Sequence, residues 1–424
     1  MATGRTYDVV VLGATGFTGQ TIAEEMIESK FQGSWAVAGR SRSKLENVVE
    51  RLDLTSASVR PDIVLADVGD APSLLALACS TRVLISAVGP FRRYGTPVVK
   101  ACIEGKCDYL DVCGEPEFME RIELEYGEAA ETAGVLITSA LGFDCVPADV
   151  GTQSAASLFK PPARCTWVES FVSIHAGEAG LGGNFATYES AVFGYAHAQS
   201  LSRLRKQAAA AKGKVDLKIP GPRPRQSAKP VWDARLRRWT LPFPAADASV
   251  VKRTWAGLAK QGEAAAHTSV SFTLADRWTV ALYVFFGTIF SFLANRAWGR
   301  TLLLRFPSLF SYGVFSREGP TDRQIHDTRF EYLHIAHGHA DPAAAAAGAP
   351  PDEHRSVRIV GPEPGYIACS IFVTQAANVL LEERDAIGAR GGVLTPGLLL
   401  RGTSYLDRIR ARGIRVEEVP TPSA

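Results

Sequence analysis

The chain has 424 residues, of which 46% are hydrophobic and 21% are charged, and its formal net charge is +2. This composition excludes a disordered chain, and the length accommodates two or three domains. Seven cysteines, an odd number without close pairing, argue against a disulfide framework. The first residues lead into an apolar run without a signal-peptide pattern, so we expect synthesis in a reducing cytosol.

The apolar run at residues 7–12 ends in glycines spaced three apart, and residues 20–29 continue at helical period. Glycines let the backbone turn tightly, and a helix N-terminus offers unpaired N–H groups and the positive end of a dipole. The pattern predicts a nucleotide site, although the spacing is one position off the dinucleotide fingerprint and lacks the G-K-[ST] ending of an NTPase loop. The expected cofactor-binding residues of this turn are Gly13, Thr15, Gly16, Phe17, Thr18 and Gly19.

A basic cluster follows the second predicted strand, residues 35–40. An NAD enzyme would place an acid here, on the 2′-hydroxyl of the ribose. Instead Arg40, Ser41 and Arg42 stand here, and no carboxylate occurs before Glu46. Guanidinium groups pair well with a phosphate, so the cluster favours NADP(H) over NAD(H), with a solvated strand end as the alternative.

The first 145 residues alternate strand and helix at the rhythm of βαβ units. We therefore predict an α/β fold with a Rossmann-type, doubly wound parallel sheet, whose ligand lies across the carboxyl ends of the strands. Further candidate cofactor residues stand after the third, fourth and sixth strands. They are Asp67, Gly89, Pro90, Gly142 and Phe143.

Past Gly142 the pattern changes, and we expect an inserted α+β substrate domain at residues 146–362. Residues 363–424 are expected to return to the first domain. Residues 203–253 carry 14 Lys/Arg against three Asp, which indicates a surface that meets something anionic. Residues 341–352, rich in alanine and flanked by prolines, read as a low-complexity loop.

Residues 278–294 form a run without a charged side chain, rich in Phe, Val and Leu. As a helix this run would span about 26 Å, short of the ~30 Å hydrocarbon core of a bilayer. A buried core helix, a monotopic or hairpin membrane insertion and a spanning helix all remain open. The basic stretch upstream favours an insertion, and we expect residues 278–315 to associate with a membrane.

Three acidic residues near the predicted strand ends are candidates for chemistry. Asp144 follows the sixth strand, where it could orient a substrate or move a proton, or else cap the next helix, a role that Asp149 could also take. Asp111 and Glu115 have two similar options, proton transfer or hydrogen bonds that stabilise a turn.

Three histidines lie close together in the sequence but do not predict a metal site. On a strand His337 and His339 would share one face, whereas His334 would point to the other. No metal is expected.

Seven strings stand in order along the chain: GATGFTG (13–19), WAVAGRS (35–41), VGPF (88–91) with YG (94–95), GFDCVPAD (142–149), EGPTD (318–322), GPEPGY (361–366) and GGVLTP (391–396). Together they resemble the saccharopine dehydrogenase-like oxidoreductases, nearly end to end. The N-terminal strings also resemble the trans-acting enoyl reductases of mycobacteria. One departure is Ala186-Thr187, where relatives tend to carry Gly-Thr, which puts a close approach of substrate to backbone in doubt.

The resemblance implies an NAD(P)-linked reductase with a Rossmann domain and an inserted domain, and relatives found at lipid droplets and other membranes. We therefore expect an NADP(H)-dependent oxidoreductase that reduces an apolar, lipid-like substrate at the cytosolic face of a membrane or lipid droplet. The expected partners are that substrate, the lipid surface and a second copy of the chain, but no nucleic acid. A saccharopine dehydrogenase-type amino-acid oxidoreductase and a cofactor-binding membrane protein without turnover remain alternatives.

Overall fold

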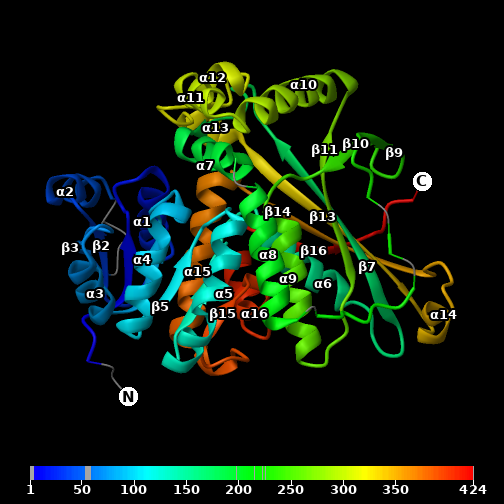
Figure 1. Ribbon diagram of the computed structural model, residues 1–424, viewed down its shortest axis with the longest axis horizontal. Coiled ribbons are helices and arrows are strands. Elements are labelled where there is room, and N and C mark those ends of the chain that lie inside the picture. Colours follow the sequence, from blue (N-terminus) through cyan, green and yellow to red (C-terminus); the bar gives the residue numbers. More distant parts are fainter. Residues whose placement is uncertain are drawn as a thin grey trace. The chain divides into compact units, whose positions relative to one another are not determined.

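The structure is a computed structural model that describes residues 4–52, 59–196, 198–213, 215–221, 223–224 and 226–423 (Figure 1). The chain divides into two compact units. The first consists of Met1–Phe143 and Pro364–Arg412, and the second of Asp144–Glu363 and Gly413–Ala424. The first two of the three crossings between the units lie within two residues of the expected domain boundaries.

The end of the chain departs from the prediction. Residues 413–424 belong to the second unit, so the expectation that all of 363–424 returns to the first domain is wrong. Gly413 has a φ of +89°, which turns the chain. Strand β16 (Arg415–Val419) then pairs antiparallel with β14 (Glu353–Gly361), so that backbone groups which would otherwise lie at a sheet edge are hydrogen-bonded.

The first unit contains a seven-stranded, fully parallel sheet of order β15-β6-β5-β4-β1-β2-β3. Its central strands are buried along most of their length, because helices cover both faces of such a sheet. The six predicted strands are present, and β15 from the C-terminal segment adds a seventh. The strands are β1 Tyr7–Leu12, β2 Trp35–Gly39, β3 Asp62–Leu65, β4 Thr81–Ser86, β5 Asp108–Asp111, β6 Leu136–Thr138 and β15 Gly392–Leu394.

The helices of the first unit come from both of its chain segments. From the N-terminal segment come α1 Phe17–Glu28, α2 Arg42–Arg51, α3 Ala71–Ser80, α4 Phe91–Glu104 and α5 Pro116–Ala133. From the C-terminal segment come η1 Pro364–Ala368, α15 Cys369–Glu382, η2 Arg384–Ala386, α16 Pro396–Leu400 and α17 Tyr405–Ala411.

A bidentate ion pair fastens the C-terminal segment to α1. Arg412 donates from Nε to Glu25 Oε1 and from Nη2 to Glu25 Oε2, each at 2.8 Å. Glu25 is 4% exposed, so its charge depends on this partner.

The second unit contains a mixed seven-stranded sheet of order β16-β14-β13-β7-β11-β10-β9. Only β7 and β11 pair in parallel. Helices α6 and α9 pack together, α6 against β7 and β13 and α9 against β11 (Figure 1). The remaining strands are β7 Arg164–His175, β8 Gly183–Asn184, β9 Val231–Asp233, β10 Arg238–Pro242, β11 His267–Leu274, β12 Phe315–Ser316 and β13 Arg329–His339. The helices are α6 Val146–Ala156, α7 Phe185–Ala196, α8 Ala198–Lys212, α9 Asp247–Lys260, α10 Arg277–Ala294, α11 Ala297–Arg305, α12 Pro307–Phe310, α13 Asp322–Asp327 and α14 Pro342–Ala346.

The segment 341–352 is not entirely a loop, contrary to the prediction. It contains the short helix α14, which begins because Asp341 accepts a hydrogen bond from the backbone N–H of Ala343 at 2.8 Å. The proline after Asp341 and the alanine run favour this single turn.

The apolar run forms helix α10, and most of this helix lies outside the core. Only Leu293 and Ala294 of its residues are buried. Trp278, Phe285 and Phe292 are 72%, 58% and 52% exposed, so the interpretation as a buried core helix is wrong. Among the residues that the structure describes, two helices are long and apolar enough to cross a membrane, α10 and the segment 364–382, but 78% of the apolar window in the latter is buried.

Arg412→Ala should lower the free energy of unfolding of the first unit by about 3 kcal/mol, because it leaves a buried carboxylate without its partner. Arg410→Ala is the matched control, since Arg410 and Asp407 form an exposed pair one turn away. That substitution should lower the free energy of unfolding by less than about 1 kcal/mol. If denaturant unfolding showed the same loss of free energy for both variants, the contact between Arg412 and Glu25 would not stabilise this unit.

Candidate cofactor-binding site

Two glycines bring β1 and α1 into close contact. A Cβ atom on Gly19 would lie 2.2 Å from the carbonyl oxygen of Gly13, and one on Gly13 would lie 2.7 Å from Val88 Cγ2. Gly13 also has a φ of +87°, which L side chains rarely adopt. The first and third glycines of the motif are therefore required by packing within the protein.

The middle glycine faces open space. Gly16 is the N-cap of α1, and a Cβ atom there would meet only the Gly13 carbonyl oxygen, at 3.4 Å. No side chain caps the helix, and its first turn carries no acidic residue. The backbone N–H groups of the first turn and the helix dipole therefore favour an anion, and the turn fits the diphosphate of a dinucleotide.

The glycine turn is supported by side-chain contacts. The sequence alone did not reveal these contacts. Gln20 Nε2 donates to the Thr15 carbonyl oxygen at 3.1 Å, and Arg51 Nη2 donates to Gln20 Oε1 at 3.0 Å. The Phe17 ring packs edge-on against Tyr366, with centroids 4.5 Å apart. The Phe17 side chain thus packs within the protein, which leaves its backbone N–H as the group available to a ligand.

The basic cluster lies next to the glycine turn. Gly13 N donates to the carbonyl oxygen of Ala38 at 2.8 Å, so the carboxyl ends of β1 and β2 are adjacent. Arg40 and Arg42 follow directly and are exposed. Ser41 is the N-cap of α2, and its hydroxyl accepts the backbone N–H of Lys44 at 3.5 Å.

Asp67 lies after β3, the edge strand of this sheet. Its Oδ1 accepts the backbone N–H of Gly69 at 2.9 Å, an arrangement that stabilises a turn. A cofactor-binding role for this carboxylate remains a prediction.

The N-terminus of α4 lies at the same edge of this sheet. A carboxylate of the protein itself, that of Glu115, already occupies it. The Glu115 carboxylate accepts the backbone N–H of Phe91 at 2.8 Å and Nε of Arg92 at 2.9 Å. Glu115 is 4% exposed, so it caps α4 from inside the protein. Gly89 and Pro90 precede this helix, and a Cβ atom on Gly89 would contact only the Phe91 ring, at 3.8 Å.

Asp111 joins the carboxyl ends of β5 and β6. Its carboxylate accepts hydrogen bonds from Tyr109 OH, Ser139 Oγ and the backbone N–H groups of Cys113 and Ala140, at 2.7–3.1 Å. Burial raises the pKa of Asp111 to about 6, and the four donors oppose that shift. Of the two options for Asp111 and Glu115, the structure therefore supports stabilising hydrogen bonds.

Cys369 holds the loop that carries Gly142 and Phe143. The backbone N–H of Phe143 donates to Cys369 Sγ at 3.1 Å, and a Cβ atom on Gly142 would lie 3.1 Å from the same sulfur. Gly142 therefore permits the close packing of this loop against the start of α15. The backbone N–H of Phe143 is used within the protein.

Asp144 is the first residue of the second unit and follows Phe143 directly. It does not cap α6, because Cys145 occupies the N-cap position. Asp149 does not cap that helix either, since its Oδ2 accepts the Thr254 hydroxyl of α9 at 2.7 Å. Asp144 is half-buried, and burial raises its pKa to about 6.

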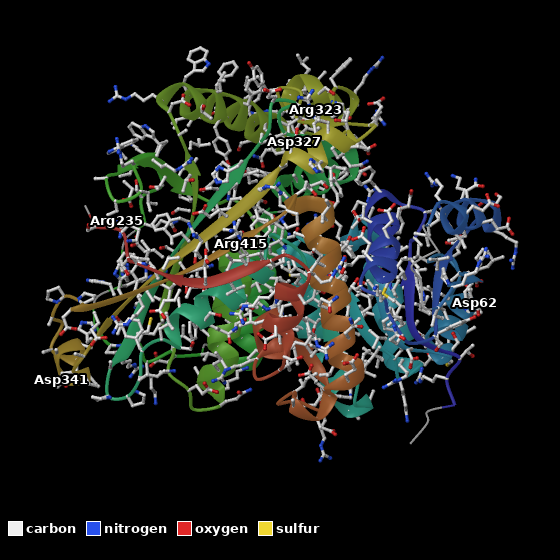
Figure 2. All side chains as sticks on the ribbon, turned by 180° about the vertical axis from the view of Figure 1, so that it is seen from behind. Asp62, Arg235, Arg323, Asp327, Asp341 and Arg415 are labelled. Atoms are coloured by element: carbon white, nitrogen blue, oxygen red, sulfur yellow. The ribbon has the colours of Figure 1, made fainter. Side chains whose placement is uncertain are left out.

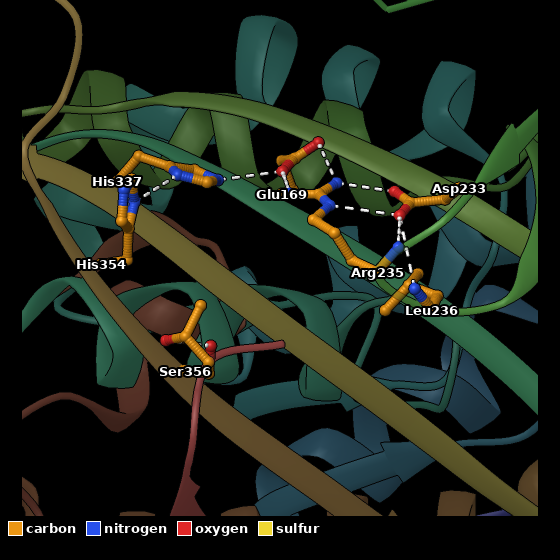
Figure 3. Close-up of polar contacts among 8 residues, drawn as sticks. Glu169, Asp233, Arg235, Leu236, His337, His354 and Ser356 are labelled. Carbon is orange, nitrogen blue, oxygen red and sulfur yellow. Dashed lines mark hydrogen bonds and ion pairs between the residues drawn. The ribbon is translucent and has the colours of Figure 1, made fainter. Parts of the chain in front are cut away.

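The three histidines of β13 have separate partners. His337 lies between Glu169 Oε2 and His354 Nδ1, each at 2.9 Å, and Glu169 also pairs with Arg235 (Figure 3). His334 Nδ1 contacts Ser170 Oγ at 2.9 Å, and His339 Nε2 contacts the Ala349 carbonyl oxygen at 3.0 Å. A β-bulge between His337 and Gly338 interrupts the strand alternation on which the sequence argument depended. Within the described part of the chain no group of three such ligands could hold a metal ion.

Comparison with known proteins agrees with this geometry. Residues 9–138 match the saccharopine dehydrogenase NADP binding domain. A protein of Arabidopsis thaliana described as a mitochondrial saccharopine dehydrogenase-like oxidoreductase is 35% identical over 97% of this chain and 96% of its own. A lipid droplet localized protein of Caenorhabditis elegans is 31% identical over 96% of this chain and 97% of its own. A trans-acting enoyl reductase of Mycobacterium tuberculosis matches 36% of each chain at 41% identity.

The fold has a solved counterpart. Apo saccharopine dehydrogenase (L-Glu forming) from Saccharomyces cerevisiae has a TM-score of 0.54 at 13% identity, covering 98% of this chain and 100% of that one. At that identity the likeness concerns the fold alone. The full-length similarity above 30% is decisive: the chain belongs to the saccharopine dehydrogenase-like oxidoreductases, and it is a pyridine nucleotide-dependent oxidoreductase with an NADP-binding Rossmann domain.

Proposed function

We propose that the protein is an NADP(H)-dependent reductase of an apolar, lipid-like substrate and works at the surface of a lipid droplet or membrane. The observation that carries this proposal is an exposed apolar lobe, which we define as α10, α11, α12 and the residues that follow to Tyr312. Large exposed apolar patches on a soluble unit mark interaction sites.

The inner side of the lobe is well packed, whereas its outer side is exposed. Tyr188 and Val192 of α7 form a buried cluster with Leu293, Ala294 and Leu303. Side chains of α10 project outward from the ribbon in Figure 2. The large apolar side chains exposed on the lobe include Trp278, Phe285, Phe292, Trp298, Phe306, Leu309 and Tyr312.

Arginines accompany these aromatic residues. The Arg296 guanidinium lies 3.6 Å from the centroid of the Phe292 ring, and that of Arg305 lies 5.6 Å from the Phe306 ring. Such pairs suit the headgroup region of a phospholipid layer, where apolar side chains enter the acyl chains and guanidinium groups meet phosphates. The lipid droplet localized relative supports the same kind of surface.

The basic segment 203–253 contributes less charge than its composition indicates. Arg235 pairs with Glu169 and Asp233 at 2.8 and 2.6 Å, and Figure 2 marks its position. The lobe, rather than this segment, is therefore the main support for lipid association.

Within the first unit we assign roles to the residues of the cofactor-binding turn. The backbone N–H groups from Phe17 to Gly19 bind the diphosphate, and Arg40 and Arg42 bind the 2′-phosphate. The bound cofactor supplies the hydride. Outside that unit Asp144 stays the candidate proton donor, since a carboxyl group whose pKa is raised to about 6 retains part of its proton near neutrality.

Gly16→Ala and Gly19→Ala form a matched pair. Gly16→Ala should fold normally but bind NADP⁺ at least tenfold more weakly, because its methyl group fills the space at the open turn. Gly19→Ala should lose about 1–3 kcal/mol of stability, because its Cβ would collide with the Gly13 carbonyl oxygen. Calorimetric titration and thermal unfolding measure the two effects. Unchanged NADP⁺ affinity in folded Gly16→Ala would contradict the assignment.

Arg42→Ala should weaken NADPH binding at least tenfold and leave NADH binding nearly unchanged, because only NADPH carries the 2′-phosphate. Arg60→Ala is the control. It removes an equal charge just before β3, at the amino edge of the parallel sheet, so neither affinity should change. An equal loss for both cofactors in Arg42→Ala would exclude this specificity role.

Phe285→Asp combined with Trp298→Asp should abolish flotation of the protein with phospholipid-coated oil droplets. Each aromatic side chain contributes about 1.5–3 kcal/mol when buried, so partitioning should fall more than tenfold. Trp232→Asp, at a 47% exposed tryptophan on β9, should float like the wild type. Flotation of the double variant would exclude the lobe as the docking surface.

The activity itself is tested by NADPH oxidation on such droplets loaded with fractions of a lipid extract. We expect oxidation that requires a lipid fraction and is lost in the non-floating double variant. Oxidation with amino-acid imines instead of lipids would favour the amino-acid oxidoreductase. Tight NADPH binding without oxidation in any fraction would indicate a cofactor-binding protein without turnover.

A further inference from the structure

The glycine turn before α1 uses its carbonyl oxygen atoms within the protein but not the backbone N–H groups that follow. The Gly13 carbonyl oxygen accepts the N–H of Gly16 at 3.0 Å, and the Gly16 carbonyl oxygen accepts the N–H of Gln20 at 2.9 Å. Gln20 Nε2 donates to the Thr15 carbonyl oxygen at 3.1 Å. In the described part of the chain the N–H groups of residues 17–19 donate to no group. The turn therefore presents donors to a ligand.

An arginine side chain is held at the same turn. Arg51, in the last turn of α2, donates from Nη2 to Gln20 Oε1 at 3.0 Å and from Nε to the Asn47 carbonyl oxygen at 3.1 Å. The amide of Gln20 thus joins the guanidinium group to the Thr15 carbonyl oxygen. These two hydrogen bonds orient the planar guanidinium group, which keeps further N–H donors for a ligand.

The positive charge of Arg51 is not balanced by an acidic residue. Among the residues that the structure describes, no carboxylate pairs with Arg51, and both of its acceptors are neutral. The first turn of α1 carries no acidic residue either. At the other end of α1, by contrast, Arg412 pairs with Glu25 and Glu28 at 2.8 and 2.9 Å. The start of α1 therefore combines the positive end of the helix dipole with an uncompensated cation, which favours an anion.

The position of Arg51 favours the diphosphate over the 2′-phosphate of the cofactor. Arg40 and Arg42 stand at the start of α2, whereas Arg51 stands at its end, about 13 Å away along the helix axis. Arg51 is instead connected to the turn that carries the N–H groups of residues 17–19. A diphosphate has enough oxygen atoms to accept hydrogen bonds from a helix N-terminus and a guanidinium group together.

We propose that Arg51 binds the diphosphate of the nicotinamide cofactor together with the N–H groups of residues 17–19. Gln20 is the positioning residue, because it holds both the guanidinium group and the turn. This inference deepens the proposed function, since it rests on binding of the diphosphate at this turn. Arg51 thus differs from Arg42, because NADPH and NADH both carry the diphosphate and only NADPH carries the 2′-phosphate.

Calorimetric titration of the full chain with both cofactors tests this assignment. Arg51→Gln removes the charge and keeps a polar side chain that is compatible with a helix. It should weaken the binding of NADPH and of NADH by the same factor, about tenfold or more. Arg51→Lys should recover part of the affinity, because it keeps the charge. Arg60→Ala, the control, should change neither affinity. Unchanged affinities in folded Arg51→Gln, or a loss limited to NADPH, would overturn the proposal.

Fragments of the cofactor locate the contact. 5′-ADP carries the diphosphate without the 2′-phosphate, whereas 2′-AMP carries the 2′-phosphate alone. Arg51→Gln should weaken the binding of 5′-ADP and leave that of 2′-AMP unchanged, and Arg42→Ala should do the reverse. Weaker binding of 2′-AMP with unchanged binding of 5′-ADP in Arg51→Gln would contradict a diphosphate contact.

Gln20→Glu separates the positioning role of Gln20 from structural support. The new carboxylate would pair with Arg51 in the first turn of α1, where an acidic residue is favourable, so the thermal unfolding midpoint should stay or rise. The affinity for both cofactors should nevertheless fall at least tenfold, because the pair neutralises Arg51 and a carboxylate cannot donate to Thr15. Retained affinity in this variant would exclude the positioning role.

A double variant shows whether Gln20 acts through Arg51. Gln20→Ala combined with Arg51→Gln should weaken NADPH binding by less than the product of the two separate factors, because part of each effect is the same lost contact. Factors that multiply fully would show that the two side chains act independently and would remove Gln20 from the proposal.

These outcomes separate this inference from the proposed function. Weaker binding in Gly16→Ala with unchanged binding in Arg51→Gln would leave the cofactor turn intact and remove Arg51 from it. Unchanged binding in both variants would remove the diphosphate from the turn itself.

Discussion

The contact between Gly13 and Gly19 is the constraint on which the first unit depends. Because Gly19 has only a hydrogen atom as its side chain, the first turn of α1 approaches the backbone of Gly13 so closely that a Cβ atom on Gly19 would collide with it. This approach directs the N-terminus of α1 toward the carboxyl edge of the sheet, beside the end of β2. It also allows α1 to pack against α15, where the Ser370 hydroxyl donates to Thr21 Oγ1 at 2.9 Å.

The N-termini of α1 and α4 lie at the same edge of the sheet, but only that of α4 is capped by a side chain. At α4 the Glu115 carboxylate, held inside the protein, satisfies the backbone N–H of Phe91. At α1 the N-cap is a glycine without a side chain, and its outer side is open. An internal anion thus excludes a phosphate from one terminus, whereas the other retains its donors. The position of the cofactor diphosphate follows from this difference in capping rather than from the glycine count alone.

The sequence predicted the parallel sheet well, because buried parallel strands are continuous apolar runs and their turns carry glycine and proline. It did not predict β16, since a short and mostly charged strand such as 415–419 forms only when an edge strand is available to pair with it. The supporting residues of the cofactor turn, among them Tyr366 and Cys369, lie more than 220 residues from the groups they contact. No local pattern encodes such contacts.

Sequence patterns were equally unable to predict which side chains are buried and which charged groups are paired. Periodicity could not separate a core helix from an exposed one at 278–294, because both are apolar and only tertiary contacts decide which side is covered. Position near a strand end likewise placed Glu115 and Asp111 among candidates for proton transfer. Their roles are instead set by hydrogen-bond donors distant in sequence, such as Phe91 and Ser139.

The central claim is that the open N-terminus of α1 binds the cofactor diphosphate while the capped N-terminus of α4 does not. Amide hydrogen exchange with and without NADP⁺ tests it most directly. The account predicts strong added protection at the backbone N–H groups of residues 17–19 and no change at Phe91 and Arg92. Protection at Phe91 and Arg92 without protection at residues 17–19 would contradict it.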